Sequence, residues 1–274
     1  MKRILPVEEL ARDDRFERIR IEEVVFDPRN AAEEARFNTL APSYVNSPDN
    51  ARGLMHGIFM GEIQALEGAG RTTFDFDDDE APFALKLDMA RQCWDESRHV
   101  EISVKLGDWM GTEIGEFTEA TFLYEAACAT DPILRLCGVN RALEGLAIDV
   151  FSTMKEFGNE SGDPVLEFCE DWMLADEVTH VKMGSDWLRR LTEKDPERRE
   201  RALEFQRTVD AIFNLGGFRG DEEENVIQLA RRFRELAGFT AEENDSLSAL
   251  ARESTEQARE MAEMATAALN AQKS

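Results

Sequence analysis

Two copies of one short motif constrain the fold of this chain more than any other feature of its sequence. Residues 95–99 read Asp-Glu-Ser-Arg-His and residues 176–180 read Asp-Glu-Val-Thr-His, although the chain has only 3 histidines among its 274 residues. Residues three positions apart lie on the same side of a helix, so each glutamate and histidine can bind one metal ion together. One Glu-x-x-His is a weak signal. Two copies, each within an apolar helical stretch, indicate two helices that face a shared metal site.

The remainder of the chain also predicts helices, and the fold class that we expect is all-α. The sequence has few helix breakers, with 8 Pro and 17 Gly, and almost no alternating segments that would indicate strands. Ser-Pro and Asp-Pro pairs, which favour helix starts, precede several apolar repeats. We expect helices over residues 48–70, 82–108, 116–130, 131–157, 163–191, 196–214, 220–237 and 240–270, preceded by a charged helix over 7–20 and a turn at 27–30.

This pattern divides the chain into three regions. We expect residues 1–46 to form an N-terminal peripheral segment and residues 47–192 to form a four-helix bundle. We expect residues 193–274 to form a C-terminal helical extension packed on the bundle. The last helix has weak periodicity, so it is either packed on the bundle or directed at another copy of the chain, which leaves a homodimer open.

A two-metal site inside a helical bundle also needs one carboxylate from each of the two other helices. Glu62 and Glu144 each lie among apolar or small neighbours in the helix that precedes one motif. Glu62 precedes Glu96 by 34 positions and Glu144 precedes Glu177 by 33, so the chain contains one helical hairpin twice. Glu67 is the competitor for the first helix, but it lies about 140° from Glu62 around the helix axis and close to the helix end.

The predicted ligand set therefore contains four carboxylates and two imidazoles. Such a set suits iron or manganese better than structural zinc, which prefers thiolates or more imidazoles. Two divalent ions would balance the four negative charges, whereas the empty site would hold buried carboxylates with raised pKa values. The residues that we expect to bind metal and to support catalysis are Glu62, Glu96, His99, Glu144, Glu177 and His180.

Three further side chains are expected to support these ligands. Asp95 and Asp176 each lie one helical turn before a histidine, and we interpret them as acceptors that orient an imidazole across the bundle. His56 lies six residues before Glu62, about 240° around the helix, so we expect a supporting or core imidazole there rather than a direct ligand.

These motifs resemble the ferritin-like di-iron carboxylate superfamily over residues 50–192. Residues 54–56 (Leu-Met-His) followed by Glu62, residues 141–144 (Arg-Ala-Leu-Glu) and residues 176–184 (Asp-Glu-Val-Thr-His-Val-Lys-Met-Gly) are more narrowly similar to a bacterial ferritin-like family without an assigned activity. The resemblance implies a ferritin-like bundle with two iron ions, the manganese–iron and di-manganese pairs being left open. It also implies O2 as co-substrate.

The superfamily hosts several activities, so the resemblance alone does not select one. Storage ferritins end soon after the bundle, whereas residues 193–274 follow it here. Radical-generating relatives carry a tyrosine where this chain has Ala65 or Leu66, and rubrerythrin-type peroxidases append a four-cysteine site whose spacing is absent here. The expected activity is an oxygenase or oxidase that hydroxylates or N-oxygenates a small-molecule substrate, with a ferredoxin or a reductase as electron donor. A ferroxidase or iron-handling protein is the alternative, and a tRNA-hydroxylase-like enzyme is less favoured.

The charge of the chain bears on its partners and its compartment. Its 57 Asp and Glu exceed its 32 Lys and Arg, giving a formal net charge of -25. Such a chain repels phosphate backbones and anionic lipid, so we expect neither nucleic acid nor membrane as a partner. The start of the chain is charged and no run approaches the roughly 18 apolar residues of a membrane span, so we expect a cytoplasmic protein.

Overall fold

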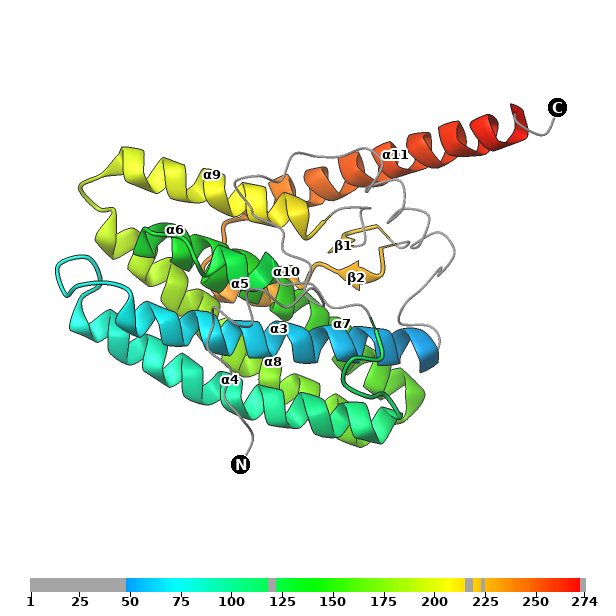
Figure 1. The fold of residues 1–274 in the computed structure, drawn as a ribbon, viewed down its shortest axis with the longest axis horizontal. Helices are drawn as coiled ribbons and strands as arrows, with labels where there is room; N and C mark the ends of the chain where they lie inside the picture. The colour runs from blue at the N-terminus through cyan, green and yellow to red at the C-terminus, as the bar shows by residue number, and fades with distance from the viewer. Residues whose placement is uncertain (1–47, 118–121, 215–218, 223–224, 272–274) are drawn as a thin grey trace.

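The computed structural model describes residues 48–117, 122–214, 219–222 and 225–271, and this part of the chain is mostly helical (Figure 1). The all-α expectation is confirmed for it, apart from two very short strands. The helix predicted over 7–20 and the turn predicted at 27–30 lie outside the described residues. The elements are α3 (Pro48–Phe74), α4 (Phe83–Met110), α5 (Phe122–Ala126), α6 (Pro132–Leu136), the π-helix η2 (Cys137–Leu143), α7 (Glu144–Ser161), α8 (Pro164–Leu191), α9 (Pro196–Ile212), β1 (Arg219–Gly220), β2 (Ile227–Gln228), α10 (Arg231–Leu236) and α11 (Ala241–Ala271).

Three helices begin at the Asp-Pro pairs that the sequence analysis marked as starts. The carboxylates of Asp131, Asp163 and Asp195 each accept a hydrogen bond from a backbone amide in the first turn of the helix that follows. The proline in each pair occupies the first turn, where a missing N–H has no cost. The left-handed glycines Gly111 and Gly162, with φ of 77° and 72°, end α4 and α7.

The four longest helices of the first two thirds of the chain lie together. α3 packs along α4 and α7 packs along α8, while α4 also contacts α8 and α3 also contacts α7. Figure 1 shows α9 and α11 on one side of this group, away from α4. α9 packs on η2 and α6, and the strand β2 packs on α7.

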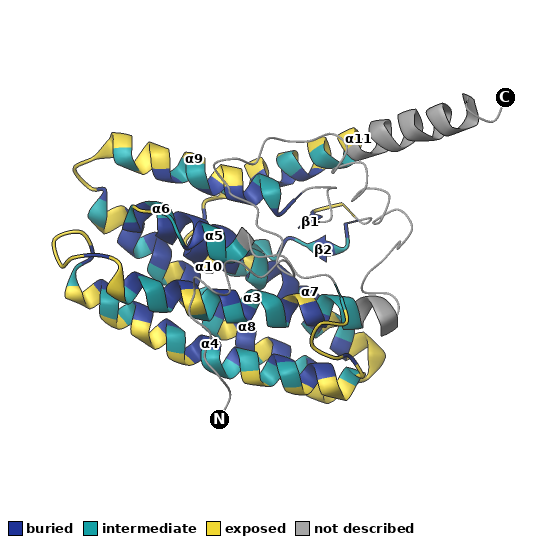
Figure 2. Cartoon of the chain, in the orientation of Figure 1, coloured by how far each residue is buried: buried dark blue, intermediate teal, exposed yellow. Residues whose placement is uncertain are grey.

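Buried residues recur along these helices, as Figure 2 shows for α3, α4 and α8. The apolar core has two main parts, one around Met55, Ile148 and Met173 and the other around Leu85 and Leu188. Along both α4 and α8, the glutamates and histidines of the repeated motif lie between these two apolar parts. The fold therefore holds the motif residues deep inside the protein rather than at a helix end.

The helix expected over 220–237 is wrong for most of its length, because among the residues described in this range only those of α10 are helical. Arg219 pairs with Ile227 in a parallel two-stranded ladder, and Oδ1 of Asp149 accepts a hydrogen bond of 2.9 Å from the backbone amide of Ala230. These partners satisfy the backbone without a helix. Arg234 Nη1 also lies 2.9 Å from Asp149 Oδ2, which ties this segment to α7.

The predicted helix over 131–157 is interrupted by the π-helix and ends at Ser161 rather than 157. Single π-helical stretches inside α-helices are common at functional sites, and this one ends directly before Glu144.

Among the helices that the structure describes, none is long and apolar enough to cross a membrane.

Candidate metal centre

The structure brings the six predicted ligands together in the buried interior. They form two overlapping groups in which the candidate ligand atoms all lie within 4.8 Å of one another. Each of the four packed helices contributes, so the groups depend on the tertiary fold. The first group contains Glu62, Glu96, His99 and Glu177, and the second contains Glu96, Glu144, Glu177 and His180.

The first group is arranged around the Nδ1 atom of His99. Oε2 of Glu62 lies 2.9 Å from this nitrogen, and Oε2 of Glu96 lies 3.2 Å from it. Oε1 of Glu177 also lies 3.2 Å from Nδ1 of His99. Three carboxylates from three different helices therefore converge on one imidazole nitrogen.

The second group repeats this arrangement around the Nδ1 atom of His180. Oε1 of Glu96 and Oε2 of Glu144 each lie 3.2 Å from it, and Oε1 of Glu177 lies 3.6 Å from it. Glu96 thus directs one oxygen toward each histidine. A carboxylate in this position can bridge two metal ions, and Glu177, which also belongs to both groups, can do the same.

The outer nitrogen of each imidazole faces an aspartate on the opposite helix. Nε2 of His99 lies 3.3 Å from Oδ2 of Asp176, and Nε2 of His180 lies 3.3 Å from Oδ2 of Asp95. Arg98 contacts both aspartates through Nη2. A proton on Nε2 that is donated to the aspartate leaves the lone pair of Nδ1 free for a metal ion. The sequence placed both aspartates one turn before a histidine, and the contact crosses between α4 and α8.

Two amide side chains that the sequence analysis did not select complete the polar interior. Gln92 donates hydrogen bonds from Nε2 to Oε1 of Glu144, at 2.7 Å, and to Oε1 of Glu96, at 2.9 Å. Asn140 in η2 donates from Nδ2 to Oε1 of Gln92, at 2.7 Å. Gln92 and Asn140 each lie four residues before a core glutamate, and this spacing was the available signal.

Burial raises the pKa of Glu62 and of Glu144, and the nearby charges of Glu96 and Glu177 raise both further. Removing a carboxylate from water disfavours its charged form, so both shifts favour the protonated form of these groups.

Burial alone would raise the pKa of Glu96. The charges and contacts of His180 and His99 outweigh burial and lower this pKa. Burial also opposes charge on both imidazoles, yet their carboxylate partners raise the pKa of His99 and of His180. Burial and the charge of Glu96 raise the pKa of Glu177, while its contacts with its neighbours lower it overall. Metal ions that bind such a site would displace protons from it, so metal affinity is expected to depend on pH.

Unpaired oxygen atoms show that the residues present fit metal ions. In the part of the chain that the structure describes, neither carboxylate oxygen of Glu177 has a hydrogen-bond partner, and Oε2 of Glu96 also lacks one. Buried carboxylate oxygens are costly unless they are paired or coordinate metal. Two of these oxygens, Oε2 of Glu96 and Oε1 of Glu177, face Nδ1 of His99 at 3.2 Å without a well-aligned hydrogen bond. This buried site of carboxylate and imidazole groups can hold a metal ion.

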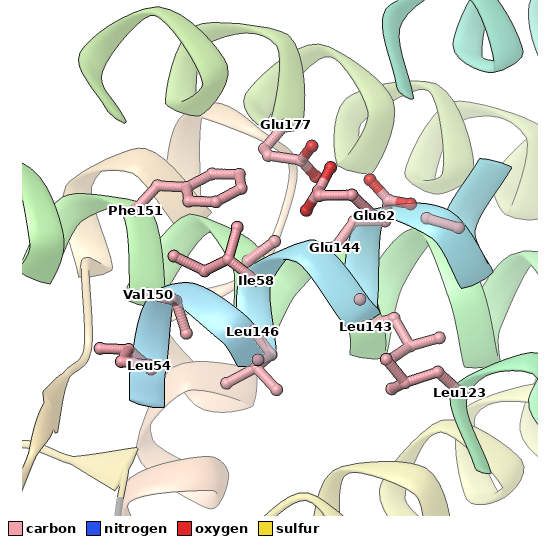
Figure 3. A pocket seen from close by; sticks show the side chains of 14 residues that line it. Leu54, Ile58, Glu62, Leu123, Leu143, Glu144, Leu146, Val150, Phe151 and Glu177 are labelled. Atoms are coloured by element: carbon pink, nitrogen blue, oxygen red, sulfur yellow. The ribbon is translucent and has the colours of Figure 1, made fainter. Parts of the chain in front are cut away.

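A cavity of about 210 Å³ adjoins the cluster. Glu62, Glu144 and Glu177 line one side of it, and Figure 3 shows their carboxylates gathered there. Apolar side chains, including Ile58 and Phe151, form much of the remaining wall. These three candidate metal ligands therefore face a space large enough for a small molecule.

His56 is buried but is not among the residues of the two groups, so of the two expected roles the structure places it in the core. Its Nε2 atom accepts a hydrogen bond of 3.1 Å from the backbone amide of Gly115, and its ring lies edge-on to Phe117 at 5.5 Å. The physical reason is the helical spacing, since six residues rotate His56 away from the face that carries Glu62.

Glu170 is a buried acid that the sequence analysis missed. It lies two helical turns before Glu177 on α8, and within the described residues neither of its oxygens has a hydrogen-bond partner. Burial raises its pKa to about 8, against a smaller opposing effect of His99. The group is therefore largely protonated at neutral pH. Its heptad spacing from Glu177 was the signal for a buried position.

The fold and the site together define a mostly helical protein with a buried carboxylate and imidazole cluster beside an apolar cavity. Comparison with protein-family models assigns the chain to a family. The chain belongs to the family described as Protein of unknown function (DUF455), whose model matches residues 3–245. No curated protein and no solved structure matches the chain.

Proposed function

We propose that this protein is a ferritin-like oxidoreductase that uses two metal ions and O2 to hydroxylate or N-oxygenate a small molecule. The observation that carries the proposal is the pair of Glu/His groups that share Glu96 and Glu177 beside a cavity. A site for one structural ion needs neither shared carboxylates nor an adjoining space. The packing of α3 on α4 and of α7 on α8, each hairpin donating Glu and then Glu-x-x-His, supports a ferritin-like four-helix bundle.

The residues divide their roles by position. Glu62 and His99 would serve as terminal ligands of one ion, and Glu144 and His180 as terminal ligands of the other. Glu96 and Glu177 would lie between the two ions. The oxygen and nitrogen donors suit iron, with manganese in one or both positions as the alternative. Such a metal pair supplies the electrons and the open coordination positions that O2 activation needs.

The protein itself controls three aspects of the reaction. Asp95 and Asp176 hold the imidazoles with Nδ1 toward the cluster. Apolar walls, such as those of Ile58 and Phe151, exclude water from the reacting atoms. The cavity brings the substrate to the carboxylate side of the site, so that binding replaces a bimolecular encounter.

The proposed hydroxylation is balanced in atoms and electrons. The substrate R–H and O2 give R–OH and water when two electrons and two protons are supplied. One oxygen atom enters the new C–O bond, and the other leaves as water. For a single turnover the two electrons would come from a reduced metal pair held by these residues, and repeated turnover would need an electron donor of the ferredoxin or reductase class.

A single-turnover reaction tests this proposal. The protein is loaded with Fe(II) without oxygen, exposed to 18O2 with a panel of small organic molecules, and analysed by mass spectrometry, with Glu177→Ala as the control. We expect 18O in an organic product of the wild-type protein only. Iron oxidation at one rate whatever molecule is added, with no labelled product, would instead establish the ferroxidase alternative.

A further inference from the structure

We propose that the cavity beside the metal ligands binds an uncharged, mainly hydrocarbon substrate between one and two aromatic rings in size. The inference rests on the proposed function for the chemistry that follows binding, but the binding itself can be measured without turnover. Three observations support it: the volume of the cavity, the chemistry of its wall, and the small residues that open it.

The volume sets the size of the occupant. The cavity holds about 210 Å³. An apolar cavity of about 150 Å³ inside a protein stays dry and binds benzene, so this space accepts a somewhat larger molecule. A nucleotide or a long acyl chain exceeds it.

The wall excludes a charged substrate. Among the described residues that line the cavity, the titratable ones are the carboxylates Glu62, Glu144 and Glu177, and none is Lys, Arg or His. In the metal-free protein, an anion would find no counter-charge on this wall and would meet three carboxyl groups. A cation would gain nothing once the metal ions neutralise those carboxylates. Burying an unpaired charge in apolar surroundings is costly, so a neutral molecule fits best.

The polar side of the cavity gives the occupant one orientation. Glu177, which is only 1% exposed, lines the cavity, and within the described structure both of its oxygens lack hydrogen-bond partners. The remaining wall is apolar and includes Leu54, Leu146 and Val150. A hydrocarbon body packed against this wall directs its nearest C–H or N–H group at the cluster.

Small side chains on α3 make this space. Gly57, Gly61 and Ala65 line the cavity at intervals of four residues, on one face of the helix. A Cβ atom built on Gly61 would meet its nearest described neighbour, Leu123 Cδ1, at 3.7 Å, which is ordinary van der Waals contact. A larger side chain at position 61 can therefore enter the cavity without a backbone clash.

Gly61→Leu tests the proposal, and Gly70→Leu is its matched control. Gly70 lies on the same helix but outside the cavity, and a Cβ atom there would also meet its nearest neighbour, Cys93 Sγ, at 3.7 Å. Ala147→Leu fills the cavity from α7 on the opposite wall, so the test does not depend on one variant. Circular dichroism and thermal unfolding establish that each full-length variant is folded.

Binding is measured by 19F NMR titration of the full chain, with and without two equivalents of Zn(II). The probes are 4-fluorotoluene, 4-fluorobenzoate and 4-fluorobenzylammonium, which have similar size and different charge. We expect wild type and Gly70→Leu to bind 4-fluorotoluene at least tenfold more tightly than 4-fluorobenzoate without Zn(II), and at least tenfold more tightly than 4-fluorobenzylammonium with Zn(II). We expect Gly61→Leu and Ala147→Leu to bind 4-fluorotoluene at least tenfold more weakly than wild type.

Unchanged binding of 4-fluorotoluene in both filled variants, equal binding of a charged probe in the condition given for it, or no binding to wild type would each overturn the proposal. Zn(II) content is measured on the same samples. Binding of the probe by a chain that retains no metal would refute the proposed function while the cavity assignment stands. Retention of two ions without probe binding would refute the cavity assignment while the proposed metal site stands.

Discussion

Oδ2 of Asp95 on α4 lies 3.3 Å from Nε2 of His180 on α8, although the two residues are 85 positions apart in the chain. The related pair Asp176 and His99 has the same 3.3 Å separation in the opposite direction between the two helices. Each motif therefore contributes candidate ligands to the site and also contacts the histidine of the other motif. This exchange accounts for the aspartate that directly precedes Glu96 and Glu177.

Replacing Asp95 with Asn should weaken metal binding without unfolding the protein. The amide oxygen of Asn accepts a weaker hydrogen bond from the Nε2–H group than a carboxylate does. The imidazole of His180 is therefore less well oriented and less basic. Loss of such an outer carboxylate costs roughly 10- to 100-fold in metal affinity. Competition with a chelator measures the affinity, and Asp108→Asn, an exposed change on the same helix, is the control. Equal affinities of Asp95→Asn and wild type would show that the contact has no orienting role.

Gln92→Leu should lower the free energy of unfolding. The substitution removes the donor to Glu96 and Glu144 and leaves Nδ2 of Asn140 without the acceptor that it has in the structure. A buried polar group that loses its partner costs about 1–3 kcal/mol. Urea denaturation measures the change, with Gln257→Leu on the exposed face of α11 as the comparison. Equal losses in the two variants would contradict a structural role for the Gln92 amide.

Glu170→Gln should remove part of the pH dependence of stability. The pKa of Glu170 rises from an ordinary 4.5 to about 8 on folding, so folding favours its protonated form. That contribution to stability is complete below the unfolded pKa and is lost as the pH rises toward about 8. Glutamine imitates the protonated group at every pH. Relative to Glu170→Gln, metal-free wild type should therefore lose stability between about pH 5 and about pH 8, by several kcal/mol at most. Parallel denaturation profiles over this range would contradict the assignment of a buried neutral acid.

Gly184→Ala should destabilise the contact between α8 and η2. A Cβ atom at position 184 would lie 2.5 Å from Cβ of Asn140, closer than two such atoms can approach. Overpacking of this kind costs typically about 1–3 kcal/mol. Gly57→Ala provides the contrast, because a Cβ atom there meets no described atom within 4 Å, and replacing Gly with Ala inside a helix gains up to about 1 kcal/mol. The two variants should change the urea midpoint in opposite directions.

The sequence predicted the ligand cluster because its information is periodic. A Glu-x-x-His pair on one helix face, repeated at nearly equal distances after Glu62 and Glu144, restricts which side chains can meet. The Asp-Pro pairs predicted helix starts for the same reason, since capping depends on adjacent residues. These local rules do not need the tertiary structure.

Other features depend on contacts that no local rule contains. The segment over 220–237 is mostly not helical because Asp149, on a distant helix, accepts the amide of Ala230. The spacing of Gln92 from Glu96 indicates one of its contacts, but its hydrogen bond to Glu144 on another helix depends on the tertiary packing. The cavity is likewise a property of the packing between α3 and α7, although the small residues Gly57 and Gly61 mark one of its walls.

Metal stoichiometry tests the central claim most directly, because the two groups share Glu96 and Glu177. Purified wild type, Glu62→Ala, Glu96→Ala and Glu177→Ala are loaded with Fe(II) without oxygen, desalted and analysed by inductively coupled plasma mass spectrometry. The account predicts two ions per chain for wild type, about one for Glu62→Ala, which removes a ligand of one group only, and fewer than one for each shared-ligand variant. Fewer than one ion in folded wild type, or two ions retained in both Glu96→Ala and Glu177→Ala, would contradict it.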